Sequence, residues 1–228
     1  GEYFDWVELW NEPNNKIEYD YTMDYSWEKF ATMVGMAAHW AKERGKKTLL
    51  GGMSPIDPNW LRMMINQGVL EKIDAIGIHG FPYVFDQQWS SWEKNISNVR
   101  NVLQKNNLKR ELWISEAGFS TWQNDEVKQY EEFKKVLDTD VERVYWYSLK
   151  DLDPKLPTVG GYHLDEREYH FGLKTATGEK KLLYRLLEKG GVENLESFDF
   201  IRKYKASKQN ENYILITGGA GFVGANLA

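Results

Sequence analysis

Five short apolar runs, each followed by a longer stretch of helical periodicity, constrain the fold of this chain most strongly. The runs are nearly continuous in apolar residues, as expected for strands that are covered on both faces. Strand and helix alternate throughout, and each repeat has about the length of a strand–helix–strand unit. The pattern therefore predicts an α/β fold with a parallel sheet and outer helices. The predicted strands are residues 5–10, 48–53, 73–79, 111–116 and 142–148.

Local signals place helices between these strands. Asp57 is suited to cap a helix that carries Pro58 in its first turn and ends at Gly68. A longer helix ends in a basic turn followed by Gly45. On pattern alone, an open doubly wound sheet and a closed (β/α)8 barrel both remain possible, and five strands are fewer than a barrel's eight. The predicted helices cover about residues 25–44, 58–67, 88–106, 125–138 and 179–188.

Composition limits the classes of function. The chain has 228 residues, a net charge of −5 and no cysteine. The lack of cysteine excludes disulfides and thiol chemistry within the chain, and the acidic balance argues against a nucleic-acid partner. No apolar run approaches the ~18 residues of a membrane span, so we expect no membrane partner. Aromatic residues make up 14% of the chain, and their flat faces suit sugar rings, although most such residues pack in the core.

Two of the predicted strands end in a glutamate. The run 7–10 leads into Glu12, and the run 112–115 leads into Glu116. In a parallel barrel every strand delivers its carboxyl end to the same face, so these acids would meet although they lie far apart in the sequence. Glycoside cleavage needs two carboxyl groups in opposite protonation states. The pair therefore indicates a glycosidase site, and two unrelated surface glutamates are the alternative, since the chain has 34 acidic residues.

Both glutamate motifs resemble those of one group of enzymes. Trp10-Asn11-Glu12-Pro13-Asn14 resembles the acid/base motif on the fourth strand of clan-A retaining glycoside hydrolases. Ile114-Ser115-Glu116-Ala117-Gly118 resembles their seventh-strand nucleophile motif. The resemblance covers roughly residues 5–188, and it implies that residues 1–188 form strands four to eight of a (β/α)8 TIM barrel. It further implies hydrolysis of O-glycosidic bonds in a carbohydrate substrate by retaining double displacement, with no cofactor and no metal.

The resemblance assigns chemistry to the two glutamates and one neighbour. Glu12 would be the general acid/base, Glu116 the nucleophile, and Asn11 would hydrogen-bond the 2-hydroxyl of the sugar. The first three strands of such barrels carry further sugar-binding groups, and they are not in this sequence. We therefore expect a half-barrel with open edges, and open edges invite pairing with other chains. Such a piece is expected to be inactive or poorly soluble on its own.

Three further residues are candidates for contact with the sugar. His79 would position Glu116 or the sugar, with a hydrogen-bonded core histidine as the alternative. Trp146 would be the floor on which the sugar stacks, with ordinary barrel packing as the alternative, and Tyr83 is a further stacking candidate. The segment 163–170 is rich in His, Asp and Glu, but it shows no recognised ligand spacing, and we interpret it as a loop beside the cleft.

The end of the sequence carries a different signal. Residues 189–212 are polar and are interpreted as a linker, after which an apolar run leads into Gly218, Gly221 and Gly224. Glycines at this spacing allow a tight turn, the close approach of a pyrophosphate and helix packing. The segment closely resembles the start of the extended short-chain dehydrogenases, which include NAD-dependent sugar-nucleotide epimerases and dehydratases. The resemblance implies that residues 213–228 begin a Rossmann domain that would bind NAD in a longer parent protein.

Three interpretations of the whole chain follow, and one of them, an open sheet of unrelated purpose, would require Glu12 and Glu116 to lie far apart. The first is a retaining glycosidase barrel fused to an NAD-dependent epimerase or dehydratase. The alternative is a non-catalytic carbohydrate-binding or scaffolding barrel, in which case the epimerase domain carries out all the chemistry. Fusion to an NAD-binding domain favours the cytoplasm, by analogy only.

Overall fold

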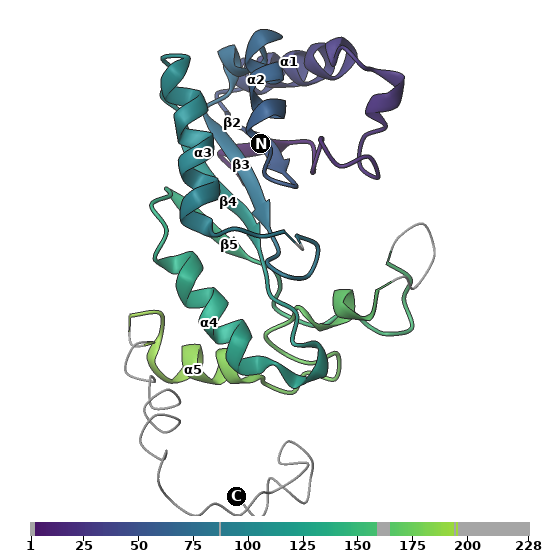
Figure 1. The fold of residues 1–228 in the computed structure, drawn as a ribbon, viewed down its shortest axis with the longest axis vertical. Coiled ribbons are helices and arrows are strands. Elements are labelled where there is room, and N and C mark those ends of the chain that lie inside the picture. The colour runs from purple at the N-terminus through teal and green to yellow at the C-terminus, as the bar shows by residue number, and fades with distance from the viewer. Residues whose placement is uncertain (1–2, 87, 159–164, 194, 196–228) are drawn as a thin grey trace, which may run out of the picture. The chain divides into compact units, whose positions relative to one another are not determined.

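Strands and helices alternate along the chain as predicted (Figure 1). The computed structural model describes residues 3–86, 88–158, 165–193 and 195. The strands are β1 (Trp6–Leu9), β2 (Lys47–Met53), β3 (Ala75–Gly80), β4 (Glu111–Ala117) and β5 (Arg143–Trp146). The α-helices are α1 (Glu28–Lys42), α2 (Pro58–Asn66), α3 (Trp92–Lys105), α4 (Glu126–Leu137) and α5 (Leu182–Gly190).

The chain divides into two compact units. The first comprises Gly1–Phe119 and Glu131–Leu149, and the second comprises Ser120–Tyr130 and Lys150–Ala228. All five described strands belong to the first unit, where they form one parallel sheet in the order β1-β2-β3-β4-β5. A doubly wound sheet reverses its strand order at a switch point, whereas a barrel adds strands in sequence. The described sheet is therefore a curled half-barrel, and the α/β prediction is confirmed at this level.

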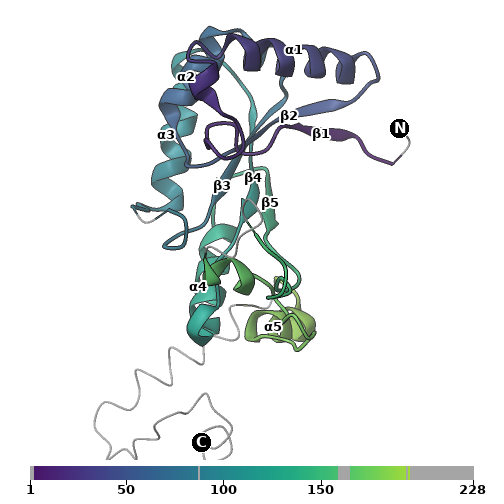
Figure 2. The same ribbon diagram turned by 90° about the vertical axis from the view of Figure 1, so that its right-hand side faces the viewer.

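Helices α1, α2 and α3 cover one face of this sheet (Figures 1 and 2). Strand residues that point towards the helices, such as Leu50, Ile76 and Ile114, are buried in the same apolar cluster as Phe30 of α1 and Val99 of α3. Successive side chains of a strand point to opposite faces. The apolar runs thus supply the outer core with every second residue and leave the remaining residues for the inner face.

The inner face of the sheet is polar and aromatic. The rings of Trp6 and Trp113 lie 4.3 Å apart between centroids, and the guanidinium of Arg143 lies 4.4 Å from the centroid of Trp113. Glu8 and Tyr145 on the same face are exposed. In a complete barrel this face would be the packed interior. At its carboxyl-terminal rim it carries the predicted glutamates.

Helix boundaries follow capping side chains. Asp57 caps α2 as predicted, since its carboxylate accepts a hydrogen bond from the second residue of the helix. Helix α3 begins at Trp92 and not near residue 88, because the hydroxyl of Ser91 accepts the Lys94 N–H at 3.1 Å and caps the helix there. Trp89 consequently lies before the helix, edge to face with Trp92.

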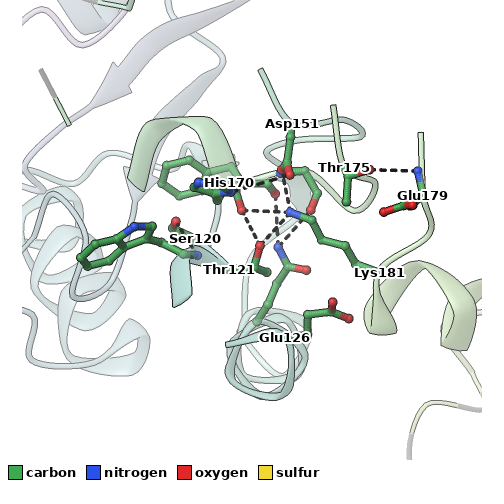
Figure 3. Close-up of polar contacts among 12 residues, drawn as sticks. Ser120, Thr121, Glu126, Asp151, His170, Thr175, Glu179 and Lys181 are labelled. Atoms are coloured by element: carbon green, nitrogen blue, oxygen red, sulfur yellow. Dashed lines mark hydrogen bonds and ion pairs between the residues drawn. The ribbon is translucent and has the colours of Figure 1, made fainter. Parts of the chain in front are cut away.

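The second unit contains a buried ion pair (Figure 3). Nζ of Lys181 lies 2.6 Å from Oδ1 of Asp151 and 2.7 Å from the hydroxyl of Thr121. The same Asp151 oxygen accepts the Gly172 N–H at 2.7 Å. The two charged side chains are only 5% and 6% exposed. Burial lowers the pKa of Lys181, although the hydrogen bond to Asp151 opposes that shift. The pair joins three segments of this unit that are distant in sequence.

Part of the sequence prediction falls outside the described residues. This holds for most of the predicted linker and for the glycine motif of Gly218, Gly221 and Gly224. It also holds for the beginning of the segment 163–170. Among the described residues, no helix is long and apolar enough to cross a membrane.

Candidate active site

His79, near the end of β3, lies between the two predicted glutamates. Its Nδ1 is 3.0 Å from Oε1 of Glu12 and 3.7 Å from Oε2 of Glu116. One oxygen of each carboxyl group and one nitrogen of the ring all lie within 4.8 Å of one another. His79 is only 1% exposed, whereas the side chain of Glu116 is 37% exposed. The half-barrel thus brings two acids, one from β4 and one from the turn after β1, to the same nitrogen, Nδ1, of a buried imidazole.

A β-bulge in β4 explains why two consecutive side chains reach His79. The register between β3 and β4 shifts after the pair Ile78–Ile114, so that His79 pairs with Glu116. A bulge places two residues of one strand opposite one residue of its partner. Accordingly, the carboxyl group of Glu116 faces Nδ1 of the ring, and the hydroxyl of Ser115 lies 3.1 Å from Nε2.

The loop that carries Glu12 is held in a strained conformation. Glu12 has a φ of 41°, in the left-handed region that favours glycine. Its Oε2 accepts a hydrogen bond from the Asn15 side chain at 2.9 Å. The Asn14 side chain accepts the Ser54 N–H at 2.9 Å and donates to the carbonyl of Pro55 at 2.7 Å. These bonds fix the loop to the end of β2 and keep the Glu12 carboxyl group facing the ring.

The two carboxyl groups differ in their electrostatic environment. Burial raises the pKa of Glu116, and the charge of Glu12 raises it further while His79 opposes the shift. Burial also raises the pKa of Glu12, but hydrogen bonds from His79 and Asn15 outweigh that effect and hold the pKa below its ordinary value. Unequal proton affinity is what a glycosidase pair requires. The order is the reverse of the one that the resemblance implies, in which Glu12 holds the proton at rest.

Trp146 does not lie with the glutamates. Its ring packs edge to face on Phe133 of α4, with 5.0 Å between centroids, and it borders the apolar cluster beneath the helices. Because side chains alternate along β5, the next residue points the other way. The rings of Tyr147 and Phe81 lie 6.0 Å apart between centroids, and the rings of Phe81 and His79 lie 6.5 Å apart. The packing of Trp146 fits the alternative given for it, ordinary barrel packing, and its contact with a sugar stays a prediction.

Asn11 and Tyr83 lie at the same end of the strands as the glutamates. Asn11 directly precedes Glu12 and is exposed. Tyr83 follows β3 in a loop, has a left-handed φ of 63°, and is 50% exposed. Their assigned contacts with a sugar remain predictions.

Glu8 is the residue that sequence reasoning missed. Its Oε1 accepts hydrogen bonds from the Ser115 hydroxyl at 2.8 Å and from the Gly52 N–H at 3.0 Å. Glu8 is thereby linked through Ser115 to His79. A charged residue within an otherwise apolar strand is costly unless it is paired, and this signal could have identified it.

The same three groups could hold a metal ion. Glu12, His79 and Glu116 each offer one ligand atom. Zinc bonds of 2.0–2.2 Å in tetrahedral geometry place ligand atoms roughly 3.4 Å apart, and the two contacts of Nδ1, at 3.0 and 3.7 Å, are close to that spacing. The donors of one imidazole and two carboxylates suit zinc better than magnesium.

Several solved structures share this fold. A family 39 glycoside hydrolase from Bacteroides cellulosilyticus WH2 aligns with a TM-score of 0.56 and 15% identity, over 82% of this chain and 40% of its own. A family 39 enzyme from Xanthomonas axonopodis pv. citri aligns with a TM-score of 0.56 and 15% identity, over 81% of this chain and 40% of its own. A family 39 β-xylosidase from Caulobacter crescentus aligns with a TM-score of 0.55 and 17% identity, over 80% of this chain and 41% of its own.

These similarities concern the fold. No protein-family model matches the chain, and no curated protein does. The chain spans about two fifths of the length of the three solved structures. At 15–17% identity the likeness carries no statement about substrate. The described half-barrel is thus similar in fold to part of the barrel of clan-A glycoside hydrolases.

Proposed function

We propose that the first unit hydrolyses O-glycosidic bonds by retaining double displacement. The observation that carries this proposal is the juxtaposition of Glu12 and Glu116, with one oxygen of each within 4.8 Å of the other. Retaining glycosidases hold their two carboxyl groups about 5–5.5 Å apart, and inverting enzymes hold them about 6.5–9.5 Å apart. The short separation supports a covalent glycosyl-enzyme intermediate, since it leaves no room for a water between the Glu116 carboxylate and the anomeric carbon.

In this proposal Glu116 attacks the anomeric carbon, and Glu12 protonates the leaving oxygen and then activates water. Asn11 binds the 2-hydroxyl of the sugar, and Tyr83 provides a face for stacking. Tyr147 takes the place of Trp146 as the aromatic residue beside the site, because its ring lies on the side of His79. The substrate class is a carbohydrate, either a glycoside or a longer saccharide.

The pKa order is compatible with these roles if His79 is counted with Glu12. The hydrogen bond to the ring is among the causes of the lowered pKa of Glu12, and in this proposal the pair holds one proton between its two members. The proton that Glu12 needs as an acid is therefore stored within one hydrogen bond of its carboxyl group. A bound sugar would displace water from the partly exposed Glu116 and place its carboxyl group against the anomeric carbon.

Azide rescue tests the assignment on aryl glycosides in the intact protein. Glu116→Gln should abolish turnover, and azide should not restore it. Glu12→Ala should lose most activity but be rescued by azide on substrates with activated leaving groups, since these need no acid. The rescued product should be a glycosyl azide with the configuration of the substrate. Glu28→Gln, an exposed acid on α1, serves as the matched control and should behave as wild type.

Two outcomes would overturn the proposal. Normal activity in both glutamate variants would show that the pair is not catalytic. Sugar binding without any turnover in the wild-type protein would favour the alternative, a non-catalytic carbohydrate-binding barrel.

For the end of the chain we propose a second domain. The glycine motif of residues 213–228 would open an NAD-binding Rossmann fold of the epimerase or dehydratase type, joined to residues 1–188 by the linker 189–212. Support comes from the sequence pattern described above. Fluorescence titration of NAD into the intact protein tests it, with Gly221→Val as the variant that should lose binding because its side chain would block the pyrophosphate.

A further inference from the structure

Glu8 and Ser115 complete a chain of hydrogen bonds that ends at the proposed acid. We propose that these two residues are positioning residues, which fix the tautomer of His79 so that its Nδ1 accepts the acid proton of Glu12. This inference rests on the proposed function and extends it to residues that do not touch the substrate. The hydrogen bonds run in the order Glu8–Ser115–His79–Glu12.

Oε1 of Glu8 acts as an acceptor in this chain. It lies 3.0 Å from the backbone nitrogen of Gly52 and 2.8 Å from Oγ of Ser115. A backbone N–H can only donate. Oε1 of an ionised Glu8 carries no proton. It therefore accepts a hydrogen bond from the Gly52 N–H and a second one from the Ser115 hydroxyl.

The hydroxyl of Ser115 has a single proton, and Glu8 takes it. Towards His79, at 3.1 Å, Oγ can therefore only accept. The proton of that hydrogen bond must reside on Nε2. Which nitrogen of a neutral imidazole carries its proton is set by the partner of the other nitrogen, and here Glu8 and Ser115 make the choice.

The consequence appears on the opposite side of the ring. With Nε2 protonated, Nδ1 of a neutral His79 has only a lone pair, 3.0 Å from Oε1 of Glu12. This hydrogen bond forms only if the pair holds one further proton, either on Glu12 or on Nδ1 beside an ionised Glu12, and the second form is the one that lowers the pKa of Glu12. When the leaving oxygen takes that proton, the ionised Glu12 is ready to activate water. In the opposite tautomer, Nδ1–H would donate to an ionised Glu12 and the acid proton would be missing.

Two glycines clear the space for this chain. A Cβ on Gly52 would lie 1.8 Å from Nε2 of His79. A Cβ on Gly77 would lie 2.8 Å from Oγ of Ser115 and 3.1 Å from Oε1 of Glu8. Both glycines are in strands, β2 and β3, between the strands that carry Glu8 and Ser115. Strands β2 and β3 therefore carry glycines, without side chains, at the positions that the row of hydrogen bonds crosses.

Nitrogen NMR of histidine-labelled protein tests the tautomer without reference to activity. The measurement uses the intact protein, and His79→Asn identifies the signals of this ring, which is one of four histidines in these 228 residues. We expect neutral His79 to show a protonated Nε2 and an unprotonated Nδ1. Ser115→Ala should give a mixture of tautomers, and Ser115→Thr, which keeps the hydroxyl, should restore the wild-type spectrum. A neutral ring protonated at Nδ1, a ring doubly protonated at every pH, or no change in Ser115→Ala would overturn the inference.

Kinetics in the intact protein test the consequence for catalysis. Ser115→Ala should reduce kcat/KM on the order of tenfold for glycosides with poor leaving groups, a part of the 10²–10⁴-fold that general acid catalysis supplies. It should have little effect on activated leaving groups. An equal loss on both substrates would indicate a merely structural role and overturn the inference. If the wild-type protein turns over no glycoside, the proposed function fails and the catalytic part of the inference with it, whereas NMR still decides the tautomer.

Discussion

Oγ of Ser115 lies 2.8 Å from Oε1 of Glu8, although 107 positions separate the two residues in the sequence. They belong to β4 and β1, which are not neighbours in the sheet. The contact therefore crosses the inner face above β2 and β3, and it exists only because the residues beneath it are small. The site therefore requires glycines at positions 52 and 77 as well as the polar side chains that form it.

Gly52→Ala is the first test of that dependence. The added methyl group would lie 1.8 Å from Nε2 of His79, so the ring must leave its position between the glutamates. We expect glycosidase activity to fall by at least the 10²-fold that a misplaced acid costs. The free energy of unfolding should fall by about 1–3 kcal/mol, as for other overpacked sites. Urea denaturation and turnover of aryl glycosides measure the two effects.

Gly35→Ala is the matched control. Gly35 lies within α1, and a Cβ there would have nothing within 4 Å. Replacing a helical glycine with alanine should raise the free energy of unfolding by about 0.5–1 kcal/mol and leave activity unchanged. Similar effects of the two substitutions would contradict the close packing of His79 on β2.

Asp24→Asn is expected to remove part of the acid sensitivity of the fold. The Asp24 carboxylate accepts hydrogen bonds from the Phe30 N–H at 2.9 Å, the Lys29 N–H at 3.2 Å and the Tyr19 hydroxyl at 2.8 Å. Burial raises the pKa of Asp24, but these bonds outweigh it and hold the pKa below the ordinary 3.8. The ionised form therefore stabilises the folded state above pH 3.8, and this contribution is lost as the pH falls through the lower pKa of the folded state.

The measurement is the urea midpoint as a function of pH. Wild-type protein should lose stability below pH 3.8, the ordinary value for Asp24, and part of that slope should be missing in Asp24→Asn. The variant should also be less stable near neutral pH, by about 1 kcal/mol, because α1 loses a charged cap. Asp5→Asn, at an exposed position, should keep the wild-type slope. An unchanged slope in Asp24→Asn would refute this account.

Strand positions and the glutamate pair could be predicted from the sequence because both depend on local patterns. Apolar runs define buried strands, and parallel strands place their carboxyl ends at one rim. This reasoning suffices to bring Glu12 and Glu116 together without knowledge of the intervening structure. The two acidic motifs can also be recognised from the sequence, since Glu12 and Glu116 lie within two residues of the ends of such runs.

Details that depend on register could not be predicted in this way. The bulge at Ser115–Glu116 turns two consecutive residues towards His79, and no composition signal marks it. Alternation along β5 does predict that Val144 and Trp146 share the helix-covered face, and both border the same apolar cluster. The family resemblance assigns Trp146 to the sugar, whereas this local rule places it on the helix-covered face.

Lys181→Met should destabilise the second unit strongly. The substitution leaves Asp151 buried with its cation removed, and the Thr121 hydroxyl loses a donor (Figure 3). Breaking a buried pair in this way costs about 3–5 kcal/mol. Its neighbour provides the control: Lys180 pairs with Glu188, and both side chains are about half exposed. Lys180→Met should change thermal unfolding little, because exposed pairs are well screened. Equal shifts in Tm for the two variants would contradict the structural role of Lys181.

Zinc should inhibit the proposed hydrolase by occupying its catalytic groups. Nδ1 of His79 and one oxygen from each of Glu12 and Glu116 lie close enough together to share an ion after small adjustments. Inhibition should be competitive with the sugar. Metal ligands must be deprotonated to bind, and burial raises the pKa of Glu116 above the ordinary 4.5. Zinc affinity should therefore begin to fall, as the pH is lowered, before an ordinary glutamate would be protonated.

Calorimetric titration of zinc separates this site from its competitor in the other unit. His79→Asn should abolish both binding and inhibition, and magnesium, which prefers oxygen ligands in octahedral geometry, should not inhibit. His170, whose Nε2 lies 3.1 Å from Oε1 of Glu166, belongs to the segment 163–170 that is rich in possible ligands. His170→Asn should therefore leave inhibition intact. Inhibition that survives in His79→Asn but disappears in His170→Asn would place the ion away from the glutamates, and zinc would then report nothing about their geometry.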